Sequence, residues 1–310
     1  MQMQTVASSL DQTVQKGNLD DYLPGAGDFF ELLKPRVMSL VIFTAIIGMV
    51  MAPGQIHPVI AFTAILCIAV GAGAAGCLNM WYESDLDARM VRTAGRPIPS
   101  GRIDRQTALH FGVALATASV LVMGLMVNYV SAALLLMTIL FYVVVYTVWL
   151  KRRTSLNIVI GGAAGAFPPM VAWAAVTGGV SLESIVLFGI IFMWTPPHFW
   201  SLSLFACKDY KAAGIPMLPV VSGEAETRKQ ILIYTLFMVP VTVLPWALGF
   251  AGAVYGMTAG IGGVIFISLS LSLFINKNII TAKRTFFYSI FYLFALFAVM
   301  GGEVVIGRMI

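Results

Sequence analysis

Nine long apolar stretches, separated by polar connections, constrain the fold of this chain more than any other feature of its sequence. A transmembrane helix needs about 20 consecutive, mainly apolar residues to cross the hydrocarbon core of a bilayer. The stretches cover residues 37–53, 58–80, 107–127, 131–150, 156–177, 182–205, 231–250, 254–275 and 286–307. Because 59% of the 310 residues are hydrophobic and only 11% are charged, a soluble core could not bury this much apolar surface. We therefore predict an all-α polytopic membrane protein with nine transmembrane helices.

The basic residues fall on alternate sides of these stretches. Every Lys and Arg except Arg308 lies in the N-terminal segment or in the connections after the second, fourth, sixth and eighth stretches. Cytoplasmic loops of membrane proteins are enriched in Lys and Arg, so these connections are predicted to be cytoplasmic. The N-terminus is then cytoplasmic and the C-terminus outside. This topology accounts for the net charge of +5, and we do not expect nucleic acid as a partner.

The N-terminal residues differ from the rest of the chain. Residues 1–28 are polar and lack the apolar core of a signal peptide. We expect a flexible cytoplasmic tail over residues 1–28 and a single transmembrane domain over residues 29–310. The three cysteines show no CxxC spacing and lie in or beside apolar stretches, so they indicate neither a disulfide framework nor a zinc site.

The stretch "NMWYESDLDARMVRTAGRPIPSG" (79–101) gathers acids and arginines directly after the second apolar stretch. Topology does not explain its acids, because the positive-inside rule does not attract Asp or Glu. Asn79, Glu83 and Asp87 follow one another at intervals of four residues and would share one face of a continuing helix. These oxygen ligands suit Mg²⁺, which keeps several waters and usually takes only one or two carboxylates together with substrate phosphates. The alternative is a solvated loop whose acids pair with its own arginines.

Several cations near this stretch could hold a phosphate. Arg92 and Arg96 follow the acids, and a guanidinium group matches phosphate oxygens in a bidentate fashion. The long connection 206–230, after the sixth stretch, carries Lys208 and Asp209. These could supply a point charge for phosphate and a further carboxylate, or form an ordinary charge pair at a helix end. Lys151 begins a basic run that topology explains as readily as phosphate binding does.

His198 lies in "WTPPHFWSL", about two turns inside the cytoplasmic end of the sixth stretch. Ionisable residues within a membrane are functional candidates by default. This histidine could ligate or orient a metal porphyrin, carry a proton, or bond to a neighbouring carbonyl.

Five blocks together resemble the UbiA superfamily of intramembrane prenyltransferases. They are "NMWYESDLD", "RTAGRPIPSG", "LKRRTSLNIVIGGAAGAFPP", "WTPPHFWSL" and "KDYKAAGIPMLPV", and they occur in the order of the family. Within the superfamily they are most similar to the branch that farnesylates haem. The resemblance extends from about residue 30 to residue 305, and five blocks in order are far more specific than any single motif.

The resemblance implies nine helices around a central cavity with two acid-bearing motifs at its cytoplasmic mouth. It implies Mg²⁺ as cofactor, farnesyl diphosphate and haem b as substrates, and a bacterial-type inner membrane as the location. It assigns Asn79, Glu83, Asp87 and Asp209 to catalysis and metal binding, Arg92, Arg96, Lys151 and Lys208 to the diphosphate, and His198 to haem. Superfamily members commonly carry a second aspartate four residues after the first in the second motif, where this chain has Ala213. Besides membrane lipid, a haem-modifying or oxidase-assembly protein is a candidate partner.

Two other functions are weighed against this one. A quinone-type prenyltransferase would use an aromatic acceptor in place of haem. A secondary transporter would place its ionisable site near the bilayer midplane on interrupted helices. In this sequence the acids gather at one face of the membrane, which favours an enzyme with its site at the cytoplasmic mouth.

Overall fold

The computed structural model describes residues 23–309, and these residues form helices with no β-strand among them. The first 22 residues, which make up most of the predicted tail, lie outside the described part. The long elements are α3 (Pro35–Met51), α4 (Pro58–Tyr82), α6 (Arg105–Met126), α7 (Tyr129–Leu140) with the π-helix η2 (Phe141–Leu150), α8 (Asn157–Ala166), α9 (Pro168–Thr177), α10 (Leu182–Phe205), α13 (Gly223–Ala247), α14 (Ala253–Asn276) and α15 (Ile279–Met309). Four short helices are α2 (Ala26–Leu32), α5 (Ser84–Asp87), α11 (Cys207–Ala212) and α12 (Leu218–Val221).

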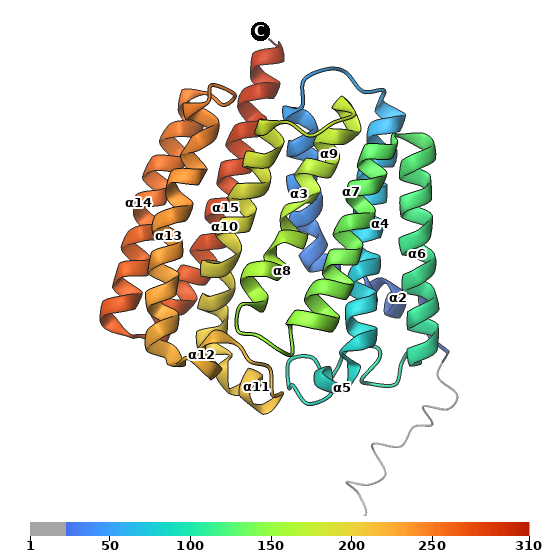
Figure 1. The fold of residues 1–310 in the computed structure, drawn as a ribbon, viewed down its shortest axis with the longest axis vertical. Helices are drawn as coiled ribbons and strands as arrows, with labels where there is room; N and C mark the ends of the chain where they lie inside the picture. The colour runs from blue at the N-terminus through green and yellow to red at the C-terminus, as the bar shows by residue number, and fades with distance from the viewer. Residues whose placement is uncertain (1–22, 310) are drawn as a thin grey trace, which may run out of the picture.

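The all-helical membrane fold predicted from hydropathy is confirmed. Eight helical segments of the described residues are long and apolar enough to cross a membrane, and the bent pair of α2 and α3 raises the number to nine. The short helices α5, α11 and α12 lie at one end of the bundle, at the bottom of Figure 1, with the C-terminus at the other end. We call this end, with the loops 83–104, 151–156 and 206–222, the charged end.

Two spans begin about two turns earlier than predicted. The ninth was expected at residues 286–307, but α15 begins at Ile279. The seventh was expected at residues 231–250, but α13 begins at Gly223. Its first two turns are polar, and they remain helical because side chains one turn apart bond to each other, as in the pairs Glu224–Arg228 and Glu226–Gln230. Hydropathy alone does not detect a helix that extends beyond the hydrocarbon core.

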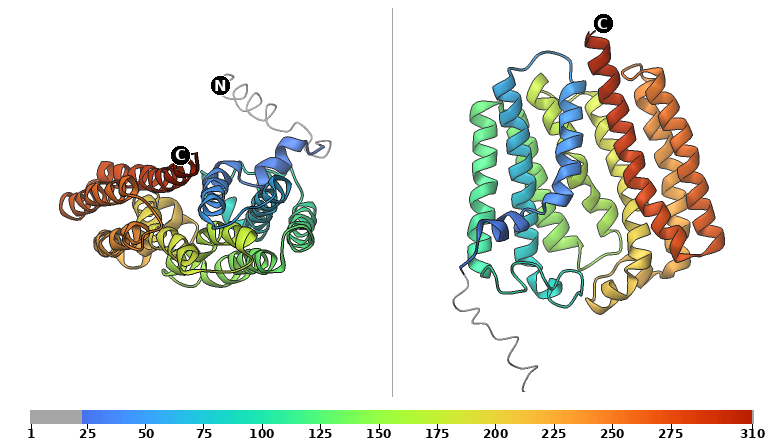
Figure 2. Two further views of the ribbon diagram at one scale, coloured as in Figure 1. Left: turned by 90° about the horizontal axis from the view of Figure 1, so that it is seen from above. Right: turned by 180° about the vertical axis from the view of Figure 1, so that it is seen from behind.

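The spans are arranged as an inner ring with further helices packed outside it (Figure 2). The ring runs from α3 to α4, then to α7 with η2, to α8 with α9, to α10 and to α15, which returns to α3. Helix α6 packs outside against α4 and α7, while α13 and α14 pack outside against α10 and α15. Most residues in the apolar part of the outer helices are not buried, as expected for a lipid-facing layer.

The fifth span is divided at Phe167, as the Pro168–Pro169 pair predicts. Proline removes a backbone donor and its ring clashes with the preceding turn, so α8 ends before the pair and α9 begins at Pro168. Helix α9 contacts α3, α4, α7 and α10, and it fills the ring in the half away from the charged end. At the closest approach, a Cβ on Gly48 of α3 would clash with the backbone of Pro169. By contrast, α10 contains a second proline pair, Pro196–Pro197, and continues through it as one helix.

The ring is open inside at the level of α8. Gly161 faces η2 and Gly162 faces α10, because a Cβ at either position would clash with a side chain of that element. At about 100° per residue, Gly165 projects between these two directions, on the side of α8 opposite the exposed Leu156. Gly165 is nevertheless exposed, and a Cβ built on it would meet no atom within 4 Å. It therefore borders open space inside the ring.

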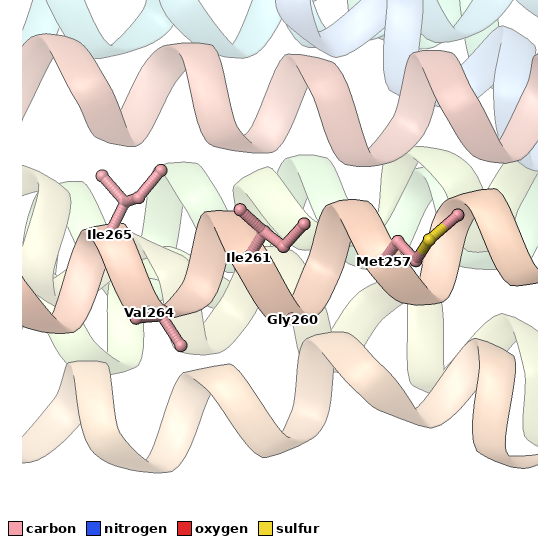
Figure 3. Close-up of a pocket in the computed structure, with 5 residues that line it drawn as sticks. All are labelled: Met257, Gly260, Ile261, Val264 and Ile265. Atoms are coloured by element: carbon pink, nitrogen blue, oxygen red, sulfur yellow. The ribbon is translucent and has the colours of Figure 1, made fainter.

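A separate apolar depression of about 380 Å³ lies on α14 and is lined by Met257, Gly260, Ile261, Val264 and Ile265 (Figure 3). Its four larger side chains are exposed, and no polar side chain lines it. Such a surface is ordinary on a helix that faces lipid, so the depression is not a candidate for polar chemistry.

Candidate active site at the charged end

The acids of the 79–101 stretch lie where α4 ends. Asn79 is in the last turn of α4, Glu83 caps the helix, and Asp87 ends α5; all three side chains are buried. The expected continuous helix through Asp87 is wrong, because the chain turns at Glu83 (φ −97°, ψ 10°). Thr93 donates a hydrogen bond to the Asp87 carbonyl (2.9 Å), and Arg96 donates one to its carboxylate (2.7 Å). These bonds tie the end of α5 to the returning loop.

Three other side chains bond to the Glu83 carboxylate or to its neighbour Asn79. The Nδ2 of Asn79 donates to Glu83 Oε2 (2.9 Å) and to Thr147 Oγ1 (3.0 Å). The ammonium of Lys34 donates to Asn79 Oδ1 (2.7 Å), and that of Lys151 donates to Glu83 Oε2 (2.5 Å). The site therefore joins the start of α3, the end of α4 and the end of η2 in one polar network.

The second oxygen of the Glu83 carboxylate, Oε1, is buried and has no hydrogen-bond partner among residues 23–309. A buried charged oxygen without a partner is costly, so such an atom points to a missing cation or donor. Oxygen donors with two carboxylates are the ligands that Mg²⁺ prefers. No group of three or more His, Cys, Asp or Glu side chains suited to a metal occurs among residues 23–309. The positive observation for a cation is the orphaned Glu83 oxygen, and Mg²⁺ usually takes only one or two carboxylates from the protein.

The π-helix η2 sets the positions of Thr147 and Lys151. Thr147 Oγ1 donates to the carbonyl of Tyr142, and the Lys151 amide donates to the carbonyl of Tyr146, both five residues back. Runs of π-helix are rare and occur frequently at functional sites. The ring of Tyr146 also lies 5.6 Å from the Lys151 ammonium, which places it within the range of a cation–π contact.

Lys34 is a site residue that the sequence reasoning did not select. It precedes Pro35, a context that favours extended backbone, yet it adopts the left-handed conformation (φ 53°, ψ 55°). Burial, and then the nearby charges of Arg96 and Lys151, lower the pKa of its ammonium from the usual 10.5 to about 7. No local pattern signals this position, because its role depends on contact with a residue 45 positions away.

The remaining predicted residues of the loops are less buried than the acids. Arg92 and Lys208 are exposed and Asp209 is half-buried. In the described part of the chain, none of the three forms a hydrogen bond or ion pair with the buried acids. The two loops nevertheless meet, because Leu86 packs with Tyr210 in one apolar cluster. The roles of these three residues stay predictions.

The alternative interpretation, in which acids of the stretch pair with its own arginines, describes the contact of Asp87 with Arg96. Asp85 pairs instead with an arginine of another loop. Asp85 lies on the surface and pairs with Arg152 at 2.9 Å. This ion pair lowers the pKa of the Asp85 carboxyl, although partial burial acts in the opposite direction. Asp85 is thus part of a solvated ion pair, whereas Glu83 and Asp87 are buried with cations around them.

His198 is buried between α10 and α15. Its ring stacks on Trp194 (centroids 4.2 Å apart) and on Phe286 (4.6 Å), and its Nδ1 lies 2.7 Å from Ser289 Oγ. Its partner is therefore a side chain of another helix, and the neighbouring carbonyl that the sequence left as an alternative is not its bonding partner.

Comparisons with known proteins agree with this architecture. The model of the UbiA prenyltransferase family matches residues 41–298. The protoheme IX farnesyltransferase of Parvibaculum lavamentivorans is 62% identical over 287 residues, covering 91% of this chain and 90% of the relative. The protein of the same name from Azorhizobium caulinodans is 58% identical over 286 residues, covering 91% and 93%.

Solved structures share the fold at low sequence identity. A digeranylgeranylglyceryl phosphate synthase aligns with a TM-score of 0.76 at 16% identity, over 90% of this chain and 98% of the other. A UbiA homolog from Archaeoglobus fulgidus, bound to DMAPP and Mg²⁺, aligns with a TM-score of 0.65 at 16% identity, over 88% and 99%. The chain described here therefore belongs to the UbiA prenyltransferase family, in the branch of the protoheme IX farnesyltransferases.

Proposed function

We propose that this protein transfers the farnesyl group of farnesyl diphosphate to a vinyl group of haem b, giving haem O and pyrophosphate. The observation that carries the site assignment is the buried Glu83 carboxylate, with one oxygen paired to Lys151 and the other without a partner among the described residues. The names of this protein's relatives support haem as the acceptor in preference to an aromatic acid. The gathering of buried charge at one end of the ring is unlike a transporter site at the midplane.

Asn79, Glu83 and Asp87 are proposed to hold Mg²⁺ together with the diphosphate, with Asp209 approaching from the second loop. When bound, the metal would supply Lewis-acid neutralisation of the diphosphate oxygens. The Archaeoglobus fulgidus homolog bound to Mg²⁺ supports a metal in this fold. The orphaned Glu83 oxygen supports the same assignment from this chain's own residues.

Without a metal, the cations of the site bond to the acids; with a metal bound, they are proposed to bind the substrate. Lys34, Lys151 and Arg96 each bond to a proposed metal ligand. A metal would take over their role of neutralising the acids, which leaves these cations, with the exposed Arg92 and Lys208, to bind diphosphate oxygens. They then stabilise the charge that develops on the leaving pyrophosphate.

The chemistry itself needs no protein nucleophile. The carbon–oxygen bond of farnesyl diphosphate breaks, and the vinyl group of haem b supplies the electron pair of the new carbon–carbon bond. Water then adds to the resulting porphyrin-side carbocation and loses a proton, which yields the hydroxyethylfarnesyl group. The open space beside Gly165 would receive the farnesyl chain and keep bulk water from the allylic cation. His198 is proposed to contact the haem.

The charged end is proposed to face the cytoplasm of a bacterial-type cell, with the protein in the inner membrane as a single nine-helix domain. The alternation of basic loops supports this orientation. A haem-modifying or oxidase-assembly protein that receives haem O is the proposed partner, because a porphyrin this apolar would not diffuse freely through water.

The test is reconstitution of the full chain with haem b, farnesyl diphosphate and Mg²⁺, followed by mass spectrometry of the porphyrin. Farnesylated haem that forms with Mg²⁺ and fails to form with EDTA is expected. A parallel reaction replaces haem with an aromatic acid, and a third measures counter-flow in liposomes. Prenylation of the aromatic acid alone, or transport without product, would overturn the proposal.

A further inference from the structure

We infer that Ser289 is a positioning residue that fixes the tautomer of His198, so that His198 Nε2 presents its lone pair to the haem iron. This inference rests on the proposed function and adds the mode of haem binding to it. It starts from the direction of hydrogen bonds at Ser289, which links α15 to α10 through two different atoms.

The serine hydroxyl has a single proton, and that proton is already used. Ser289 Oγ lies 2.6 Å from the carbonyl of Phe286, which can only accept. The hydroxyl therefore donates to Phe286 and is left with lone pairs toward His198. At 2.7 Å from Ser289 Oγ, the Nδ1 of His198 must then carry the proton and donate it. The neutral imidazole consequently has its lone pair on Nε2.

The ring of His198 is also fixed in orientation. It is stacked between Trp194 and Phe286, with interplanar angles of 17° and 22°. The indole of Trp194 is itself held, because its Nε1 donates to the Ser289 carbonyl at 2.7 Å. Ser289 thus holds both the histidine and one of the two rings that sandwich it.

The side chain of His198 faces the interior of the ring. On α10, Trp194 faces α15 through its bond to Ser289, and Thr195 faces α8, where it abuts Gly162. At about 100° per residue, His198 projects between these two directions. Trp200 projects nearly opposite, toward Tyr234 of α13. Because Nδ1 of the imidazole points at α15, Nε2 lies on the edge of the imidazole that faces away from α15.

This arrangement is the one that metal-binding histidines use. Such a histidine donates its other ring N–H to a fixed acceptor, which sets the tautomer and the ring orientation, and loss of that acceptor typically lowers metal affinity about 10- to 100-fold. His198 lies near the charged end, on the same interior as the Gly165 opening. Ligation of the haem iron there would anchor the porphyrin beside the path of the farnesyl chain.

The experiment titrates the purified full chain with haem b and records the Soret and visible bands and the electron paramagnetic resonance spectrum. Ser289→Ala is expected to weaken haem binding about tenfold and to change the ligation spectrum, while Ser289→Thr, which keeps the hydroxyl, restores both. His198→Ala should lose the histidine-ligated signal. Thr285→Ala is the matched control. Thr285 is buried on the same helix, and among the described residues its hydroxyl bonds only to the carbonyl of Thr281, so haem binding should be unchanged.

Two outcomes would overturn the inference. One is a haem affinity and spectrum that are the same in wild type, Ser289→Ala and His198→Ala. The other is lost farnesyl transfer in these variants with the wild-type haem spectrum, because His198 would then act on a proton and not on iron. Altered spectra in a protein that never farnesylates haem would instead disprove the proposed function and leave the ligation standing. Binding of Mg²⁺ and farnesyl diphosphate, measured separately, is expected to be unchanged in all four variants.

Discussion

The ammonium of Lys151 lies 2.5 Å from Oε2 of Glu83, while Oε1 of the same carboxylate is buried without a partner in the part of the chain that the structure describes. The two residues come from η2 and from the end of α4, 68 positions apart. A buried carboxylate that is satisfied on one side only is unfavourable for stability alone. The arrangement is understandable if a second cation completes the site during function.

The first prediction concerns the charge of Glu83. Glu83→Gln keeps the volume of the side chain and removes its charge, so we expect product formation to fall about 100- to 1,000-fold. The rate of haem farnesylation at varied Mg²⁺ measures this, with size-exclusion chromatography to show that the variant is folded. Asp85→Asn, which breaks only the exposed pair with Arg152, should stay within about twofold of wild type. Normal turnover in Glu83→Gln would refute the metal assignment.

The second prediction compares Lys34 with Lys277, which also has a positive φ. Lys34→Met removes an ammonium from the site and should raise the KM for farnesyl diphosphate about tenfold, since a charge-assisted hydrogen bond contributes about 1.5–3 kcal/mol. Lys277 also has a positive φ, of 52°, but it is exposed at the end of α14. Lys277→Met should leave the KM unchanged. Equal effects of the two substitutions would show that only overall charge matters.

The third prediction concerns the open space beside Gly165. Gly165→Leu would place a large side chain where the farnesyl chain is proposed to lie. We expect it to lower kcat/KM for farnesyl diphosphate at least about tenfold and to affect dimethylallyl diphosphate much less, because each methylene excluded from an apolar site costs about 0.8 kcal/mol. Ala163→Leu, on the other side of α8, is the control. Equal losses for the long and short diphosphates would contradict this placement of the chain.

The fourth prediction concerns the contact between α3 and α9. Gly48→Ala forces the two backbones apart at Pro169, and we expect the free energy of unfolding to fall by about 1–3 kcal/mol. Gly302→Ala, on α15, meets no atom within 4 Å and should leave stability unchanged or slightly raised. Thermal unfolding in detergent measures both. A stable Gly48→Ala variant would mean that the two helices can separate without cost.

Some features followed from the sequence by itself. Hydropathy predicted the spans, because the bilayer imposes a length and an apolar composition that each segment must satisfy alone. The break at Phe167 followed from the chemistry of proline, and the placement of the acids beside the end of α4 followed from their position in the chain. These properties are local, so a linear reading detects them.

Other features were decided only by the tertiary structure. The chain turns at Glu83, Lys34 enters the site, and η2 forms a π-helix, and none of these has a local signal. Each depends on a contact between segments far apart in the sequence, such as Lys34 with Asn79 or His198 with Ser289. A buried polar group must find its partner wherever packing brings one, and packing is a property of the whole ring of helices and not of any one segment.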